Sequence, residues 1–170
     1  MGAIATGDVR VLNNEVIMAA GITNAAIDKA TALQRLELDR RERLYRSGRP
    51  APELRGRTVV LVDDGIATGA TVRAAIAVVR SQKPARIVLA VPVAQQSMAT
   101  ELQREVDEFV CASTPGDLYA IGLWYDHFPQ LTDQDVQQIL ALAAAEPAAV
   151  LTDVPQRISP TRASRDHRVP

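Results

Sequence analysis

The sequence is poor in the residues that build cross-linked or metal-bound folds. The chain has 170 residues and a single cysteine, Cys111, so it contains no internal disulfide. The two histidines, His127 and His167, lie far apart, which argues against a zinc site. No apolar run approaches the roughly 20 residues of a membrane span. The first ten residues lack the basic and apolar regions of a secretory signal. These absences predict a cytoplasmic protein with no membrane partner.

An excess of one charge sign is also missing. Lys and Arg total 19 and Asp and Glu total 20, so the net charge is −1, which argues against a nucleic-acid partner. Hydrophobic residues make up 47% and charged residues 23%, as in ordinary globular domains. The length and pattern predict one domain over residues 1–147. Residues 148–170 lose all periodicity and are expected to form a disordered tail.

Apolar runs and helical patterns alternate along the chain. Their order predicts an α/β fold, with a parallel sheet and flanking helices. The run TVVLV is continuous and β-branched, which is typical of a strand buried on both faces. The expected strands are 3–5 and 9–12 in a hairpin, then 58–62, 86–93 and an edge strand at 107–112; the expected helices are 23–46, 70–81, 97–105 and 132–145.

The most informative segment joins the first long strand to its helix. The segment runs TVVLVDDGIATGAT from Thr58 to Thr71, and Asp63 and Asp64 follow the strand directly. Ligands of open α/β sheets bind at this end of the strands. Small, hydroxylated and glycine residues then lead into a helix N-terminus, where backbone N–H groups can hold a phosphate. Gly65 and Gly69 are expected to allow close backbone approach and positive φ. An acid pair followed by a phosphate-binding loop predicts a sugar-phosphate site.

VVLVDDGIATGAT resembles the phosphoribosyl-pyrophosphate motif of type I phosphoribosyltransferases. The segments RRERLYRSGRP and GLWYDHFPQ also resemble a bacterial group of this family. The resemblance implies transfer of the 5-phosphoribosyl group to a nucleobase or related acceptor, with Mg²⁺ accompanying the substrate and no direct metal ligands from the protein. It implies catalytic and ribose-binding roles for the acid pair, and a substrate-binding site made of Asp63, Asp64, Gly65, Ile66, Ala67, Thr68, Gly69, Ala70 and Thr71.

Two further segments have alternative interpretations. Arg43, Arg46 and Arg49 lie where the family has a mobile loop and are candidates to bind pyrophosphate. Alternatively they form a solvated face, because acids interleave with the arginines and predict the ion pairs Glu37–Arg41, Asp39–Arg43 and Glu42–Arg46. Four of the six aromatic residues lie in residues 116–130. Trp124 and Tyr125 are candidates for a hood over the acceptor base; alternatively Trp124 and Phe128 pin the last helix to the sheet.

The chain departs from the family pattern before its first long strand. We find no counterpart of the family's initial strand and pyrophosphate loop ahead of Val59. The resemblance therefore implies a fold that is incomplete at the N-terminus and leaves the 58–62 strand open on one edge, where a partner chain or a homo-oligomer could cover it. Besides the enzyme, two alternatives stay open: a noncatalytic regulator that binds phosphoribosyl pyrophosphate, and an inactive truncated remnant.

Overall fold

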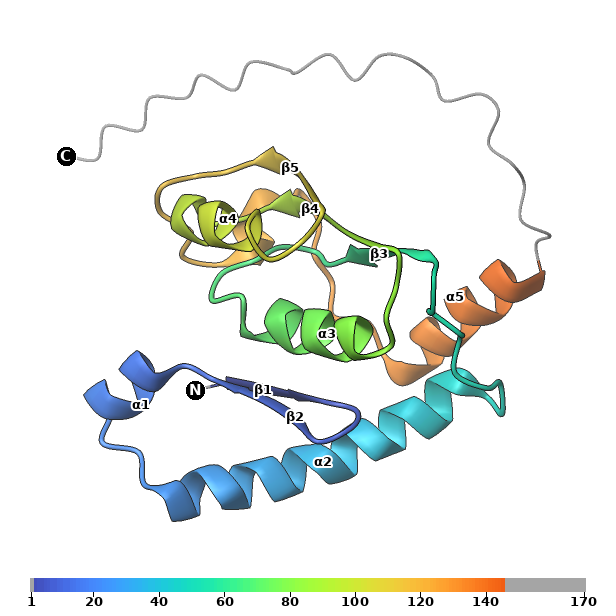
Figure 1. The fold of residues 1–170 in the computed structure, drawn as a ribbon, viewed down its shortest axis with the longest axis horizontal. Coiled ribbons are helices and arrows are strands. Elements are labelled where there is room, and N and C mark those ends of the chain that lie inside the picture. Colours follow the sequence, from blue (N-terminus) through green and yellow to red (C-terminus); the bar gives the residue numbers. More distant parts are fainter. Residues whose placement is uncertain (1, 146–170) are drawn as a thin grey trace.

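A computed structural model of the protein describes residues 2–145, in which strands and helices alternate (Figure 1). The expected 148–170 tail lies outside the described residues. None of the helices in this range is long and apolar enough to cross a membrane. The elements are β1 (Gly2–Ala5), β2 (Val9–Leu12), α1 (Asn14–Ala19), α2 (Asn24–Arg46), β3 (Thr58–Val62), α3 (Ala70–Ser81), β4 (Arg86–Val93), α4 (Gln96–Leu102), β5 (Glu108–Ser113), the 3₁₀ helix η1 (Ile121–Trp124) and α5 (Asp133–Ala145).

The parallel sheet confirms the predicted α/β fold. Its strand order is β3-β4-β5, with Val60 beside Val88 and Leu89 beside Phe109. α3 spans the predicted residues 70–81 and directs apolar residues at helical spacing toward the sheet. One face of the sheet thus forms the main core with α3 and α4. The core residues are Ile66, Val72, Ile76, Leu89, Val91, Ala94, Ala99 and Leu102.

The other face of the sheet is largely open. The prediction that β3 is buried on both faces is wrong: Val60 is 56% exposed and Val62 is 75% exposed. Val110 on β5 is 49% exposed on the same side. An apolar run predicts a strand, but it cannot reveal whether a second layer covers both faces. Within residues 2–145, no helix covers the side on which Val60 and Val62 lie.

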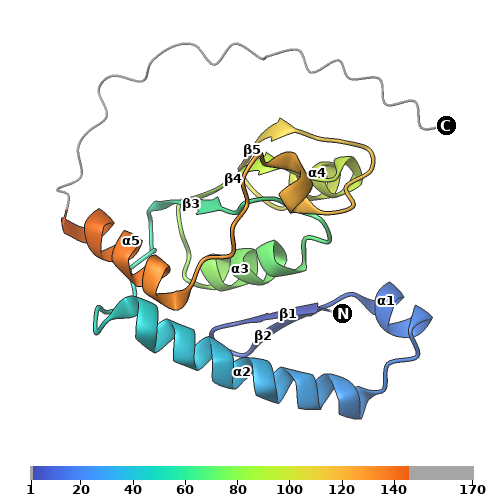
Figure 2. The same ribbon diagram turned by 180° about the vertical axis from the view of Figure 1, so that it is seen from behind.

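The β1–β2 hairpin lies between α2 and α3, as both views of the ribbon show (Figures 1 and 2). The antiparallel pairing of Ala3 with Val11 confirms the predicted hairpin. α2 begins as expected, since the Thr23 side chain accepts a hydrogen bond from the Ala26 N–H. The pattern missed the short helix α1, which Asn13 caps through the Val16 N–H.

α5 packs on the C-terminal half of α2, so the interpretation that Trp124 pins this helix to the sheet is wrong. The Asp133 carboxylate binds Arg40 at 2.7 Å and accepts the Tyr45 hydroxyl at 2.6 Å. A capping box begins this helix, because the Thr132 and Asp135 side chains each accept the other's backbone N–H. These polar contacts, rather than a buried core, position α5.

Candidate functional site

β3 places the acid pair at the edge of the sheet where the carboxyl ends of its strands meet. The Asp64 N–H donates to Asp63 Oδ1 at 3.0 Å, which orients the Asp63 side chain. Burial raises the pKa of the Asp63 carboxyl; the hydrogen bond from the Asp64 N–H offsets part of this rise, and the charge of the Asp64 carboxylate adds to it. The ionised Asp63 therefore lacks part of the hydration it would have in water. Hydroxyl donors from a ligand would restore that hydrogen bonding.

The loop after the acid pair is fixed by backbone hydrogen bonds to the end of β4. The Ile66 N–H donates to the Val93 carbonyl at 2.9 Å, and the Ile66 carbonyl accepts the Gln95 N–H at 3.0 Å. The Ile66 side chain is buried in the main core. Because the middle of the loop is anchored on both its backbone and its side chain, the neighbouring backbone groups keep a defined position.

Two glycines let this loop lie close to its neighbours, for different reasons. Gly69 has a φ of +69° and directly precedes α3, as predicted. A Cβ there would stand 2.7 Å from the Met98 sulfur. Gly65 does not adopt positive φ, so that part of the prediction is wrong. Glycine is needed at position 65 because a side chain would not fit: a Cβ there would lie 2.8 Å from Ile121 and 2.9 Å from Val93.

The N-terminus of α3 presents the groups that a phosphate needs. Thr68 and Thr71 are both exposed, and neither side chain hydrogen-bonds another group within residues 2–145. Ala67 and Ala70, which precede Thr68 and Thr71 respectively, are half-buried and add no polar side chain. The first N–H groups of this helix point out of its N-terminus without partners in the helix. The predicted 5-phosphate residues are thus contiguous and accessible.

The aromatic segment reaches the acid pair through Tyr125. Its hydroxyl donates to the Asp64 backbone carbonyl at 2.6 Å, and its ring lies 5.0 Å from that of Phe128. Trp124 is 48% exposed. Tyr125 therefore lies next to the predicted ribose site, and Trp124 directly precedes it in the chain. The composition of residues 116–130 pointed to this segment, but no local signal revealed the Tyr125–Asp64 hydrogen bond.

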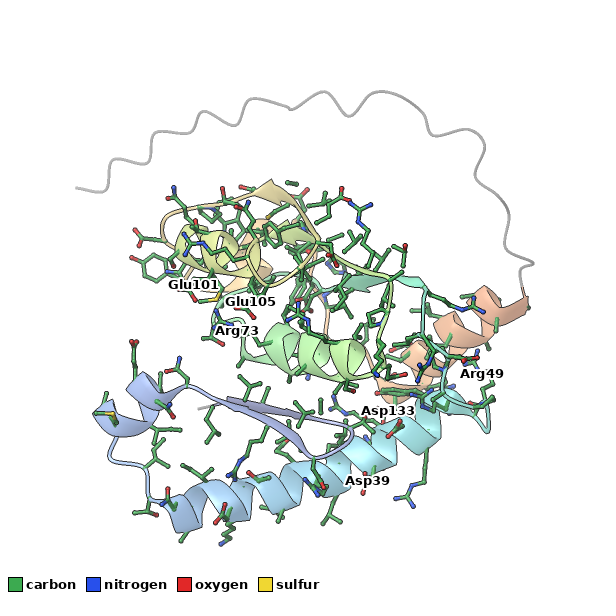
Figure 3. All side chains as sticks on the ribbon, viewed as in Figure 1. Asp39, Arg49, Arg73, Glu101, Glu105 and Asp133 are labelled. Atoms are coloured by element: carbon green, nitrogen blue, oxygen red, sulfur yellow. The ribbon has the colours of Figure 1, made fainter. Side chains whose placement is uncertain are left out.

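The candidate pyrophosphate arginines lie apart from this loop. Figure 3 shows Arg49 beside the C-terminal end of α2, across the molecule from Arg73 in α3. Arg46 pairs with Glu42, while Arg43 and Arg49 donate to backbone carbonyls of their own segment. The Glu37–Arg41 pair forms as expected, whereas Arg43 meets the Asp39 carbonyl rather than its carboxylate. In this conformation the three arginines contribute to the solvated face of α2.

Sequence reasoning missed an ion-pair cluster that joins α3, the helix after the loop, to α4. Arg73, in the second turn of α3, binds Glu101 at 2.5 Å and Glu105 at 2.8 Å (Figure 3). Glu101 lies on α4, and Glu105 follows it. The cluster ties α3 to α4 next to the Gly69–Met98 contact. No short-range spacing connects residues so far apart in the chain.

The chain matches the family model described as "Phosphoribosyl transferase domain" over residues 11–117. It therefore belongs to the phosphoribosyl transferase domain family. This assignment agrees with the resemblance that the DDGIATGAT segment carries and with the parallel sheet that positions it.

Named relatives agree with this assignment. The chain is 41% identical over 139 residues to "Putative phosphoribosyl transferase Rv0571c" of Mycobacterium tuberculosis strain H37Rv. It is equally similar to "Putative phosphoribosyl transferase MT0597" of strain CDC 1551. These matches cover 82% of this chain but only 31% of each relative, so the chain spans about a third of their length.

A solved structure supports the fold. The crystal structure of TT1426 from Thermus thermophilus is 39% identical to the chain and superposes with a TM-score of 0.64. The match covers 82% of this chain and 65% of TT1426.

Proposed function

We propose that the chain binds phosphoribosyl pyrophosphate at the β3–α3 loop and transfers its 5-phosphoribosyl group to a nucleobase or related acceptor, releasing pyrophosphate. The observation that carries the proposal is the acid pair at the end of β3, followed by an anchored loop and a helix N-terminus, in a phosphoribosyl transferase domain. Asp63 and Asp64 accept the ribose hydroxyls. The backbone from Ile66 to Thr71, with the Thr68 and Thr71 hydroxyls, receives the 5-phosphate.

The chemistry depends on positioning and charge more than on a protein nucleophile. The bond between the anomeric carbon and pyrophosphate breaks as the acceptor forms a bond to that carbon, and positive charge develops on the ribose ring. The Asp63 and Asp64 carboxylates stabilise that charge, and the loop holds the 5-phosphate in place. Tyr125 fixes the backbone at Asp64, and Trp124, the residue before it, is the proposed stacking partner of the acceptor.

Mg²⁺ is proposed to accompany the substrate. Among residues 2–145, no three His, Cys, Asp or Glu side chains are grouped to enclose a metal ion. Mg²⁺ usually keeps several waters and binds substrate phosphates, so the substrate can hold the ion without a direct ligand from the protein. When bound, the ion would neutralise charge on the departing pyrophosphate.

Titration calorimetry with phosphoribosyl pyrophosphate and Mg²⁺ tests the binding site. The Asp63→Asn, Asp64→Asn double variant removes charge from two groups that accept ribose hydroxyls. Hydrogen bonds to charged groups contribute about 1.5–3 kcal/mol each, so binding should weaken at least about tenfold. The matched control is Asp39→Asn with Glu53→Gln, which removes two exposed acids elsewhere and should bind like the wild type. Equal affinity in both double variants would rule out the proposed site.

Pyrophosphate release in the presence of a panel of bases tests the catalytic half of the proposal. A transferase releases pyrophosphate with at least one acceptor, and the Asp63→Asn, Asp64→Asn variant loses this release. Binding of phosphoribosyl pyrophosphate without release for any acceptor would instead identify a noncatalytic binding protein. No binding at all would identify an inactive remnant.

A further inference from the structure

The segment of residues 116–131 is joined to the rest of the protein by few contacts. Its exposed large side chains are Tyr119, Leu123, Trp124, Phe128 and Leu131. Within residues 2–145, its one hydrogen bond to another part of the chain runs from the Tyr125 hydroxyl to the Asp64 carbonyl. The position of the 3₁₀ helix η1 therefore depends on contacts at the carboxyl end of β3.

Two of these contacts fall on neighbouring residues of the acid-pair loop. The Ile121 side chain lies against Gly65, since a Cβ on that glycine would stand 2.8 Å from it. The Tyr125 hydroxyl donates to the Asp64 carbonyl at 2.6 Å. The Tyr125 ring is itself packed, because it lies 5.0 Å from the Phe128 ring at an angle of 38°. The hydrogen bond to Asp64 is thus made by a ring that is held in place.

The two acids of the pair are positioned in different ways. The Asp63 carboxylate accepts the Asp64 N–H at 3.0 Å, so a bond to its own oxygen orients it. The Asp64 side chain is exposed, and its carboxylate accepts no hydrogen bond from any residue that the structure describes. The direction of the Asp64 carboxylate therefore follows from its backbone, because the backbone angles decide which side-chain rotamers are allowed.

Tyr125 holds one of the two peptide groups on which those backbone angles depend. The peptide before Asp64 is bonded through its N–H to the Asp63 carboxylate. The peptide after Asp64 is bonded through its C=O to the Tyr125 hydroxyl. With both peptide groups held, rotation about the Asp64 backbone is restricted and so is the choice of rotamer. Of these two bonds, only the one from Tyr125 comes from outside the acid pair.

We propose that Tyr125 is a positioning residue for the proposed transfer, and that its hydroxyl holds the Asp64 carboxylate in the direction that accepts a ribose hydroxyl. Tyr125 acts through the Asp64 peptide and needs no contact with the substrate. Because Trp124 directly precedes Tyr125, one hydroxyl joins the proposed acceptor side of the site to the ribose side. The inference rests on the proposed function for its effect on substrate binding, whereas its effect on the Asp64 peptide requires no ligand.

Titration calorimetry with phosphoribosyl pyrophosphate and Mg²⁺ tests whether Tyr125 acts through the Asp64 carboxylate. Tyr125→Phe keeps the ring and removes the hydroxyl, so binding should weaken about two- to tenfold, the range that loss of one neutral hydrogen bond gives. Asp64→Ala removes the carboxylate but keeps the backbone carbonyl. In the Asp64→Ala background, Tyr125→Phe should therefore cause no further loss.

A matched control is available in the same segment. Tyr119 is 90% exposed and makes no hydrogen bond with the other described residues. Tyr119→Phe should bind phosphoribosyl pyrophosphate like the wild type. The unfolding midpoint of Tyr125→Phe should stay close to that of the wild type, because the Asp64 carbonyl lies where water can replace the lost hydroxyl.

NMR relaxation of the protein without ligand tests the positioning itself. The Gly65 N–H belongs to the same peptide group as the Asp64 carbonyl, so its order parameter reports the motion of that group. Tyr125→Phe should lower this order parameter below the value of about 0.85 that a rigid backbone gives. Amides of β4 in the same variant, and the Gly65 amide in Tyr119→Phe, should keep their wild-type values.

Three results would overturn the inference. The first is wild-type affinity in Tyr125→Phe, and the second is an unchanged Gly65 order parameter. The third is an equal loss of affinity with and without the Asp64 carboxylate, because Tyr125 would then act by another route. A wild type that binds no phosphoribosyl pyrophosphate would contradict the proposed function instead, and the Gly65 measurement would then decide alone whether Tyr125 positions Asp64.

Discussion

The sheet with α3 and α4 differs from the hairpin, α2 and α5 in what holds it together. The first region contains all of the main core, including Leu89, whose side chain is fully buried. The second region buries only Ile27 among the described residues of α2 and α5, and it relies on surface ion pairs such as Arg40–Asp133. Exposed ion pairs contribute little, typically about 0–1 kcal/mol. The candidate site is thus built on the firmly packed region, whereas the arginines lie in the region with little buried core.

Leu89→Ala should give the largest effect and break the packed region. Removing a buried leucine costs about 2–5 kcal/mol, so the midpoint of urea unfolding should fall sharply. Ile27→Ala is the matched change in the other region. It should mainly speed amide hydrogen exchange in α2 and the hairpin while β4 amides keep their protection. Equal loss of protection throughout the chain with both variants would contradict the division.

The second prediction compares two glycines that share the same φ angle, one packed against a neighbouring side chain and one in open space. Gly69 and Gly56 both have φ of +69°, but only Gly69 has a neighbour, the Met98 sulfur, within reach of a new Cβ. Alanine at either position should cost about 1–2 kcal/mol through left-handed strain. Gly69→Ala should cost more than Gly56→Ala, and it alone should weaken binding of phosphoribosyl pyrophosphate. Identical unfolding midpoints and affinities for the two variants would show that the Met98 contact is unimportant.

The two regions should also respond to pH with opposite sign. Burial raises the pKa of Asp63 in the folded protein, so ionisation of this carboxyl opposes folding. The protonated carboxyl carries no such cost, and the folded state therefore loses stability as pH rises from the ordinary value of 3.8 through the raised pKa. Hydrogen bonds from Arg40 and then Tyr45 lower the pKa of Asp133, so it stabilises the fold above 3.8 and loses this effect as pH falls through its lowered pKa.

Single substitutions can separate these responses. At neutral pH, Asp63→Asn should raise the melting temperature and Asp133→Asn should lower it slightly, with faster exchange in α5. At a pH well below the ordinary value of 3.8 both differences should shrink, as calorimetry at a series of pH values would show. Shifts of the same sign for both variants at neutral pH would contradict the comparison.

The sequence predicted features that local chemistry controls, and it failed where distant segments decide. Thr23 and Thr132 begin helices because their side chains reach backbone groups three residues on, and Gly69 takes positive φ because of its place before α3. The exposure of Val62 depends on a layer that no local pattern describes. The hydrogen bond from Tyr125 to Asp64 and the cluster around Arg73 likewise join residues far apart in the chain. The acid pair and the loop could therefore be found from the sequence, whereas the long-range contacts that hold them in place could not.

The place of Trp124 has an optical consequence. It is the single tryptophan of the chain, and it directly precedes the tyrosine that holds the backbone of Asp64. Excitation at the red edge of protein absorbance therefore selects one indole, which is half exposed to water and adjoins Tyr125 in the chain. A ligand that stacks on this ring or displaces water from it should shift the emission toward the blue and protect it from iodide quenching. The protein carries its own fluorescent reporter of the candidate site, with no label required.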